Sequence, residues 1–468
     1  MTAVPRVVIA APSSGHGKTA VAVGLLAALR ARGLKTAGFK VGPDHVDAAY
    51  LGLAAGRPGR NLDPRLVGAA TVGPLFSYGS AGADIAVVEG TMGLYDGLAG
   101  RTEAESTAQL AGLLRAPVVL VVDVAAMGQS VAALTHGFRA YDELLWLGGV
   151  ILNRVASDRH EDLLRESLDE IGVPVLGAVR QRELPRSGLP ARDEGVVPVV
   201  HHSVAATRAV RHLGEVVAGA VDLDRVLALA RSAPRLVAEV WRPPGTAAPG
   251  TRPVIAVAGS ARCAYGYAEA AELLTAAGAE VAMVDPLRDE TLPGNTSALV
   301  VGGGLPEAYL DELAANVALA TRVRQFALTG RPIVAEGIGL AWLAREFDGR
   351  PMCGVLDVVG RTGEHPVVGY REATVGTAGP HLSPGTEVVG YKQHRGLVTP
   401  RAGQHPAWSW PGGQPEGFVR GGVHASYLCL HWAGRPDIAS RLITAAASGS
   451  EYGGSAEYGE ENTLRLVS

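Results

Sequence analysis

The sequence is poor in cysteine, in aromatic residues and in long apolar runs. Its three cysteines, Cys263, Cys353 and Cys429, lie far apart and in no metal-ligand spacing. We therefore expect a reduced, cytoplasmic protein without structural disulfides. The longest apolar run, residues 116–127, is interrupted by Asp123 and is too short to cross a bilayer, and no N-terminal signal peptide is evident. A net charge of −4 favours neither nucleic acid nor an anionic membrane surface as a partner.

Lysine is also scarce beside arginine, and this makes the positions of the lysines informative. Lys18, Lys35 and Lys40 all lie in the first forty residues. Lys35 follows a glycine-containing turn and is expected to be solvated. Arginine serves equally well as a solvating charge, so Lys18 and Lys40 are candidates for chemistry. The chain of 468 residues is long enough for two or three domains.

Residues 7–20 have the pattern of a phosphate-binding loop between a strand and a helix. An apolar run, residues 7–11, leads into small residues and the sequence GHGKT, and a helix-forming run over residues 21–32 follows. Backbone N–H groups of Ser14, Gly15, His16, Gly17, Lys18, Thr19 and Ala20 are expected to surround a phosphate. The Lys18 ammonium would reach the β and γ phosphates of ATP, and the Thr19 hydroxyl would bind Mg²⁺. Pro12 replaces the usual first glycine, and a purely structural turn is the alternative.

Six apolar runs separated by helical patterns predict a parallel α/β sheet. Runs of Val, Ile and Leu without polar alternation are typical of strands that are buried on both faces. Ligands bind such sheets at the carboxyl ends of the strands, so polar residues at those ends are the most informative. The predicted strands are residues 7–11, 36–41, 85–89, 118–123, 148–153 and 174–179.

Three polar residues at or just after strand ends are candidate ligands. Asp44 and Glu89 are candidate Mg²⁺ ligands, directly or through water. For each of them, a helix cap or a turn acid is the alternative. Asn153 ends a later strand, where a nucleotide base could lie.

Several long motifs resemble those of the cobyrinic acid a,c-diamide synthase family. They are FKVGPDHVD (residues 39–47), NLD (61–63), VVEGTMGLYDG (87–97) and GVILNRV (149–155). The family's proteins are glutamine-dependent amidotransferases that act on corrin carboxylates, with an ATPase domain similar to dethiobiotin synthetase. The resemblance implies that ATP phosphorylates a carboxylate and that ammonia then displaces phosphate. It also implies catalytic roles for Lys18, Lys40 and Asp47.

The chain is expected to divide into two domains. Residues 1–235 would form the ATP-binding amidoligase domain and residues 236–253 an exposed, Pro- and Gly-rich linker. Residues 254–447 resemble a class I glutamine amidotransferase domain, and residues 448–468 are expected to be a disordered tail. A Pro-punctuated loop is expected at residues 184–192.

The second domain lacks both residues that the resemblance would require for glutamine hydrolysis. The family's AECGGL turn reads AEGIGL here, so Gly337 occupies the position of the nucleophilic cysteine. Its SYLHLH run reads SYLCLH, so Cys429 occupies the position of the histidine base. The GHEFHYS run is also altered and contains Lys392. Cys353 has no evident base nearby, and His394, His424 and His431 are expected to pack rather than catalyse.

These observations favour an α/β protein of two parallel-sheet domains that acts as an ATP- and Mg²⁺-dependent amide-forming ligase. The nitrogen donor would be free ammonia, another amine or a separate glutaminase, and a corrinoid is the default substrate by resemblance. The resemblance also favours a homodimer. The alternative is a nucleotide-dependent binding or regulatory protein that no longer forms amides. A partitioning-type ATPase is disfavoured, because Ser13 stands where that class has a signature lysine.

Overall fold

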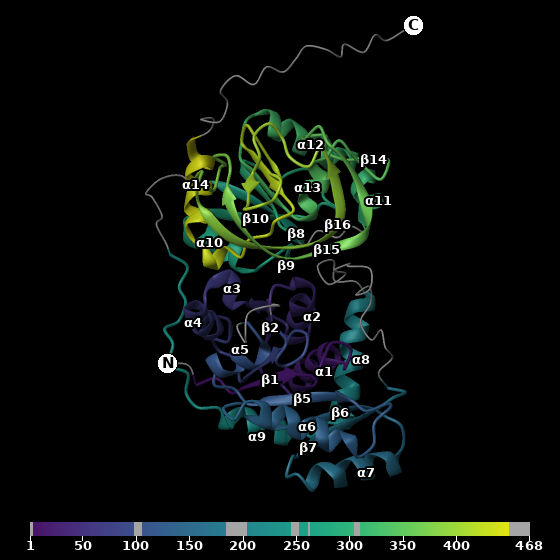
Figure 1. Cartoon of the computed structure of the whole chain (residues 1–468). Helices are drawn as coiled ribbons and strands as arrows, with labels where there is room; N and C mark the ends of the chain where they lie inside the picture. Colours follow the sequence, from purple (N-terminus) through teal and green to yellow (C-terminus); the bar gives the residue numbers. More distant parts are fainter. Residues whose placement is uncertain are drawn as a thin grey trace.

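The computed structural model describes residues 3–97, 105–183, 204–244, 252–260, 263–303 and 309–448. Figure 1 shows two α/β domains stacked end to end, with the first half of the chain below the second. The loop predicted at 184–192 and all but the first residue of the predicted tail lie outside the described residues. None of the described helices is both long and apolar enough to cross a membrane.

The first domain is built on a seven-stranded sheet in the order β3-β2-β4-β1-β5-β6-β7, and every neighbouring pair is parallel. Strands β1, β2 and β4 are buried along their whole length, as their apolar residues on both faces require. The predicted parallel sheet is confirmed. The strands are β1 (Arg6–Ala10), β2 (Thr36–Val41), β3 (Arg60–Leu62), β4 (Ile85–Glu89), β5 (Val118–Asp123), β6 (Leu147–Val155) and β7 (Val175–Arg180).

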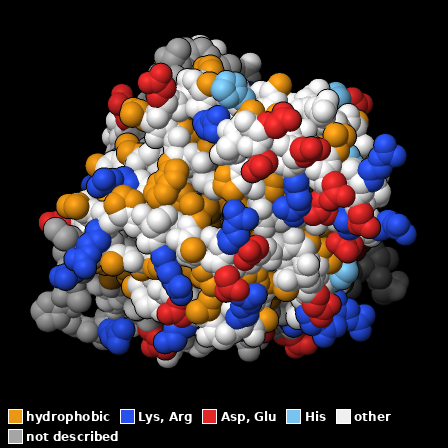
Figure 2. All heavy atoms as spheres, turned by 90° about the horizontal axis from the view of Figure 1, so that it is seen from below, with side chains coloured by type: hydrophobic (Ala, Val, Ile, Leu, Met, Phe, Trp, Pro, Cys, Tyr) orange, Lys and Arg blue, Asp and Glu red, His pale blue; other side chains and the backbone are white. Residues whose placement is uncertain are grey.

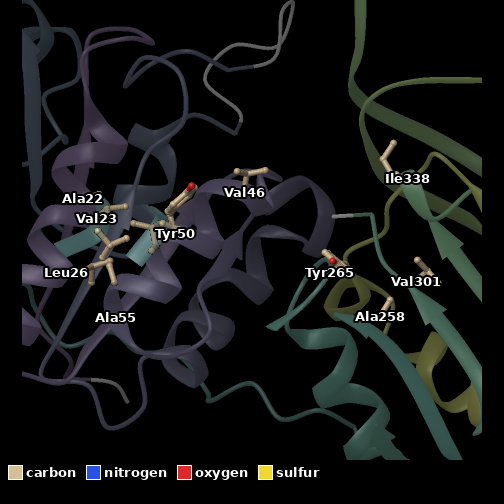
Figure 3. Packing of buried hydrophobic residues seen from close by; sticks show 14 of the residues in the cluster. Ala22, Val23, Leu26, Val46, Tyr50, Ala55, Ala258, Tyr265, Val301 and Ile338 are labelled. Atoms are coloured by element: carbon tan, nitrogen blue, oxygen red, sulfur yellow. The ribbon is translucent and has the colours of Figure 1, made fainter. Parts of the chain in front are cut away.

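Helices cover both faces of this sheet. Alternate residues of β1 point to opposite faces, so Val7 and Ile9 pack with α1, α2, α8 and α9, whereas Val8 and Ala10 pack with α4 to α7. Figure 3 shows Ala22, Val23 and Leu26 of the first helix beside Tyr50 of the second. The helices are α1 (Lys18–Ala31), α2 (His45–Ala55), α3 (Pro64–Val67), α4 (Ala69–Gly79), α5 (Thr107–Leu113), α6 (Ser130–Tyr141), α7 (Asp158–Asp169), α8 (Val204–Ala220) and α9 (Leu223–Ser232).

The start of the predicted linker is exposed at several residues, but two of its apolar side chains are buried. Trp241 is buried, its ring lies 5.2 Å from that of Tyr78 on α4, and its backbone N–H donates to the Pro74 carbonyl. Leu236 is buried as well. A tryptophan and a leucine bury enough apolar surface to hold this segment against the first domain. Residues 245–251 of the predicted linker are outside the described residues.

The second domain has a mixed central sheet in the order β10-β8-β11-β12-β19-β18, with β9 paired to β8. The five strands from β10 to β19 are parallel to their neighbours, and β18 and β9 are antiparallel additions. The strands are β8 (Val254–Ser260), β9 (Cys263–Ala264), β10 (Glu280–Val284), β11 (Thr296–Val301), β12 (Ile333–Glu336), β18 (Phe418–Arg420) and β19 (Val423–Ser426). The helices are α10 (Glu269–Ala276), α11 (Leu310–Ala315), α12 (Val317–Leu328), α13 (Ile338–Leu343) and α14 (Asp437–Ser448).

A further sheet in this domain has no counterpart in the sequence-based prediction. Its main part is a long antiparallel pair, which Figure 1 shows along the side of the second domain that faces the first. Buried and exposed side chains are mixed along both strands, because one face of the pair is covered and the other is more open. The strands are β13 (Glu346–Phe347), β14 (Arg350–Pro351), β15 (Val359–Val375), β16 (Glu387–Thr399) and β17 (Trp408–Ser409).

Polar side chains join the two domains. The Arg60 guanidinium of β3 donates to Glu269 at 2.7 Å and to Glu272 at 2.5 Å, both on α10. The Tyr370 hydroxyl of β15 donates to Asp63 at 2.7 Å.

Figure 2 views the molecule from below, and on this surface lysine and arginine side chains are interspersed with acidic ones around apolar side chains. Charges of both signs therefore share this face.

Histidines without charge are buried in the second domain. The rings of His381 and His424 meet edge to face at 4.5 Å, and Trp408 packs on His424 at 5.2 Å. Burial lowers the pKa of His424 to about 4 and that of His381 below its ordinary value. Burial also lowers the pKa of His394, which stacks on Tyr427, to about 4. Their neutral forms are therefore part of the fold.

We predict that the second domain loses stability between pH 6.5 and pH 4. These histidines take up protons in the unfolded chain before they do so in the folded one, so unfolding becomes easier as pH falls through this window. A shift from 6.5 to about 4 is worth ~3 kcal/mol for His424. The thermal midpoint, followed by tryptophan fluorescence, is expected to fall less with pH in His424→Gln than in the parent. An unchanged pH slope in that variant, matching the slope of the exposed control His212→Gln, would contradict the prediction.

Candidate nucleotide and amide-forming site

The predicted phosphate loop lies between the end of β1 and the start of α1. Gly15 and Gly17 adopt left-handed backbone conformations, with φ of 90° and 92°, and α1 begins at Lys18. Glycine is suited to both positions because a side chain strains this conformation. The loop therefore leads directly into the N-terminus of α1. The first backbone N–H groups of a helix lack helical partners and can bind a phosphate. Residues 14–20 all lie in the loop or in the first helical turn.

Asn153 of β6 holds the loop from the neighbouring part of the sheet. Its side-chain amide Nδ2 donates to the His16 carbonyl at 2.9 Å. The approach is so close that a Cβ on Gly17 would collide with this nitrogen. The other amide atom, Oδ1, is buried and has no hydrogen-bond partner among the described residues. Asn153 thus supports the loop with one atom and leaves an acceptor for a ligand.

His16 anchors the loop to β5. Its ring nitrogen Nδ1 lies 2.8 Å from the backbone N–H of Asp123 and accepts a hydrogen bond from it. This bond requires the neutral ring. Burial and the nearby cations Lys18 and Arg154 lower the pKa of His16, which favours that form. Arg154, in a left-handed conformation, forms an ion pair with the Asp123 carboxylate.

Lys18 lies over the loop rather than in solvent. Its Nζ donates to the Ser13 carbonyl at 3.1 Å and to the Met92 carbonyl at 2.5 Å. Met92 has a positive φ of 47°, an unusual conformation for a residue with a side chain. The loop after β4 therefore contacts the phosphate loop through the predicted catalytic lysine.

Lys40, Glu89 and Asp47 form a buried charge cluster at the carboxyl ends of β2 and β4. The Lys40 Nζ lies 2.8 Å from a carboxylate oxygen of each acid. All three side chains are at most 4 % exposed. Burial alone would lower the pKa of Lys40, but Glu89 and Asp47 outweigh it and raise that pKa. Burial raises the pKa of Glu89, and Asp47 adds to this effect, while Lys40 opposes it.

The geometry around Glu89 suits a cation. The Thr19 hydroxyl donates to Glu89 Oε1 at 2.5 Å, so these two predicted metal ligands are adjacent. Glu89 Oε2 is buried without a hydrogen-bond partner among the described residues. When Glu89 and Asp47 are both ionised, Lys40 balances only one of the two carboxylate charges. Among the described residues no three His, Cys, Asp or Glu side chains could hold a metal by themselves, so a Mg²⁺ ion here would also need water or phosphate oxygens.

Asp44 is a helix cap. Its Oδ1 accepts from the backbone N–H groups of Val46 (2.8 Å) and Asp47 (3.2 Å) at the start of α2. The structure thus gives Asp44 the structural role that the sequence left as an alternative, with Oδ1 already engaged. Its role as a metal ligand stays a prediction.

Two positioning residues escaped the sequence analysis. Asn61 donates to the carbonyls of Gly42 and Asp44, and Tyr267 of the second domain donates to the carbonyl of Pro43. Asn61 lies in the NLD motif, so the motif gave a signal without indicating the contact. Nothing in the local sequence around Tyr267 indicates its partner in the other domain.

In the second domain, Gly337 and Cys429 lie side by side. Gly337 forms the turn from β12 to α13 with φ of 54°. A Cβ on Gly337 would lie 3.2 Å from Cys429 Sγ, 2.7 Å from Gly303 Cα and 2.8 Å from the Gly303 carbonyl oxygen. The Cys429 sulfur packs directly on Gly303. Burial first, and then Glu336, raises the pKa of Cys429, so it is a neutral thiol.

The surroundings of Cys429 are buried and polar. Burial raises the pKa of Glu336 to about 8, while its carboxyl accepts from Leu430 N and from the Trp432 indole. Lys392 is buried in an ion pair with Glu416, and its Nζ lies 4.8 Å from the centre of the Trp410 ring. His394, His424 and His431 are all buried.

Comparison with known proteins identifies both domains. Residues 7–190 match the family described as the CobQ/CobB/MinD/ParA nucleotide binding domain. Residues 254–437 match the CobB/CobQ-like glutamine amidotransferase domain. The chain is 50 % identical to hydrogenobyrinate a,c-diamide synthase of Streptomyces coelicolor, over 94 % of this chain and 97 % of that protein. It belongs to the cobyrinate and hydrogenobyrinate a,c-diamide synthase family.

Other members are similar over the same length. Hydrogenobyrinate a,c-diamide synthase of Mycobacterium bovis is 46 % identical over 95 % of this chain and 98 % of that protein. Cobyrinate a,c-diamide synthase of Syntrophotalea carbinolica is 39 % identical over 94 % and 98 %. The predicted family is therefore confirmed, and so are a P-loop nucleotide-binding domain and a glutamine amidotransferase-type domain.

We predict that Gly17→Ala weakens ATP binding by at least about tenfold, or about 1.4 kcal/mol. The new Cβ would displace Asn153 and strain a backbone at φ 92°. Binding is measured by calorimetry with a non-hydrolysable ATP analogue. Gly33→Ala is the control, because φ is 86° there but no atom lies within 4 Å of the new Cβ. Equal affinity in the two variants would contradict the steric argument.

Proposed function

We propose that this chain is an ATP- and Mg²⁺-dependent ligase that converts carboxylates of a corrin ring into amides, with ammonia from outside the chain as nitrogen donor. The observation that carries the ligase part is the cluster of Lys18, Thr19, Lys40 and Glu89 at the phosphate loop. The names of the full-length relatives supply the corrin substrate. The observation that carries the nitrogen donor is the Gly337–Cys429 pair.

The chemistry requires activation of the carboxylate. A carboxylate oxygen attacks the γ-phosphorus of ATP, ADP leaves, and an acyl phosphate forms. Ammonia then attacks the carbonyl carbon, phosphate leaves, and the nitrogen loses a proton to give the amide. Most of the catalysis in such transfers comes from positioning and from cations that stabilise developing charge.

The predicted site residues have the following roles in this proposal. The backbone of residues 14–20 holds the phosphates, and Asn153 Oδ1 accepts a hydrogen bond from the amino group of the base. Thr19 and Glu89 would hold Mg²⁺, with Asp44 contributing directly or through water, and the ion would compensate the charge of the phosphates. Lys18 and Lys40 face the transferred phosphoryl group, and Asp47 orients Lys40 toward the substrate.

In this proposal glutamine does not serve as the donor, because Gly337 has no side chain to act as nucleophile. Cys429, at the position of the base, is a neutral thiol whose sulfur occupies the space between Gly303 and Gly337. Cys353 is also buried, and burial raises its pKa far above the ordinary value, so it offers no thiolate. Ammonia from solution or from a separate glutaminase would enter instead.

We predict that the chain forms a corrinoid amide with ATP and ammonium but not with ATP and glutamine. Product mass is measured for a corrinoid diacid in parallel reactions with each donor. Lys18→Ala is expected to abolish the product, because it removes a cation that this proposal assigns to the phosphates. Equal turnover with glutamine would refute the assignment of the second domain. Tight ATP binding without product from either donor would favour the regulatory alternative.

A further inference from the structure

A side chain from the second domain completes the support of the turn that leads into α2. Three consecutive backbone carbonyls of this turn each accept a hydrogen bond from a side chain. Asn61 Nδ2 donates to Gly42 O at 2.7 Å and to Asp44 O at 2.9 Å. Between them, the Tyr267 hydroxyl donates to Pro43 O at 2.9 Å. Proline has no backbone N–H, so this carbonyl is its only backbone hydrogen-bonding group.

Tyr267 is itself held firmly. Its side chain is buried, and its ring stacks on His431 with centroids 4.3 Å apart and meets His45 edge-on at 6.3 Å. Glu269, two residues later, is paired with Arg60, which precedes Asn61 on β3. The segment at the start of α10 therefore contacts the turn directly through Tyr267, and through Glu269 it contacts Arg60, the neighbour of Asn61 on β3.

The turn connects two elements of the buried charge cluster, since Lys40 lies near the end of β2 before it and Asp47 lies on α2 after it. Asp44 caps α2, and Asp47 lies in the first turn of that helix, 2.8 Å from Lys40. Lys40 in turn contacts Glu89, which contacts Thr19. A shift of the turn would move Asp44 and Asp47 relative to this cluster, and displacements of about 1 Å can reduce rates by two orders of magnitude.

We infer that Tyr267 is a positioning residue of the synthetase site, through which the second domain holds the turn at residues 42–44 in its Mg²⁺-binding shape. The inference rests on the proposed function, since it concerns the same site. It gives the second domain a role that does not need a nucleophile at residue 337. The hydroxyl acts on the Pro43 carbonyl and touches no reacting atom.

A second interdomain tyrosine provides a matched control. The Tyr370 hydroxyl donates to Asp63 at 2.7 Å, a bond of similar geometry across the same interface. Asp63 caps the short helix α3 and not the turn before α2. If the tyrosines only dock the domains, removal of either hydroxyl has the same effect. If Tyr267 positions the turn, its removal has a specific effect on Mg²⁺.

The test compares Tyr267→Phe and Tyr370→Phe in the full chain. Binding of a non-hydrolysable ATP analogue is titrated by calorimetry over a range of Mg²⁺ concentrations. Tyr267→Phe is expected to raise the Mg²⁺ concentration for half-maximal binding at least fivefold, and Tyr370→Phe to change it less than twofold. The thermal midpoint is expected to fall at least as much in Tyr370→Phe as in Tyr267→Phe, because a hydrogen bond to a carboxylate is worth more than one to a backbone carbonyl.

A rate measurement adds a second readout. With ammonium as donor, Tyr267→Phe is expected to lower kcat about tenfold or more at saturating Mg²⁺ and to leave the KM for ATP unchanged. An unchanged Mg²⁺ midpoint in Tyr267→Phe, or an equal shift in both variants, overturns the inference. If the parent chain forms no amide but the Mg²⁺ midpoint still shifts only in Tyr267→Phe, the proposed function fails and the positioning role stands.

Discussion

The ion pairs of Lys40 with Glu89 and Asp47 are the constraint on which the candidate site depends. Charges that are almost fully buried are tolerated only when they are paired and hydrogen-bonded, because their desolvation costs several kcal/mol per ion. The three groups come from β2, β4 and α2, so these elements must meet in one register. The parallel pairing of Lys40 with Glu89 across β2 and β4 provides that register. Thr19 then connects the cluster to the phosphate loop through its hydrogen bond to Glu89.

The second domain contributes structural contacts to the candidate site of the first domain. Its turn at Gly337 has the strand-to-helix geometry of a nucleophile site, but the neighbouring sulfur of Cys429 fills the space beside it. Tyr267 and Glu269 bind the first domain through buried polar contacts. Polar contacts of this kind fix orientation more than they add affinity, because each must compensate for lost water. The interface thus specifies how the domains sit.

The sequence predicted the first domain well and the interface poorly, for a physical reason. Strands β2, β4 and β5 were predicted at their observed bounds, because burial on both faces leaves continuous apolar runs. Strand β3 was missed because it has three residues, and β15 and β16 because their mixed exposure leaves no continuous apolar run. The contacts of Asn61 and Tyr267 join residues 19 and 224 positions away. Such contacts exist only in the folded chain and leave no local pattern.

Gly337 and Tyr267 differ in what a substitution would cost the fold. Glycine at residue 337 avoids the strain that a side chain would have at positive φ, so the turn there does not depend on a side chain. Losing the Tyr267 hydroxyl would leave the Pro43 carbonyl without its partner in a buried interface, at about 1–3 kcal/mol. The fold therefore needs no side chain at position 337. The hydrogen bond from Tyr267 to Pro43 cannot be dispensed with in the same way, because it serves both the domain interface and the charge cluster.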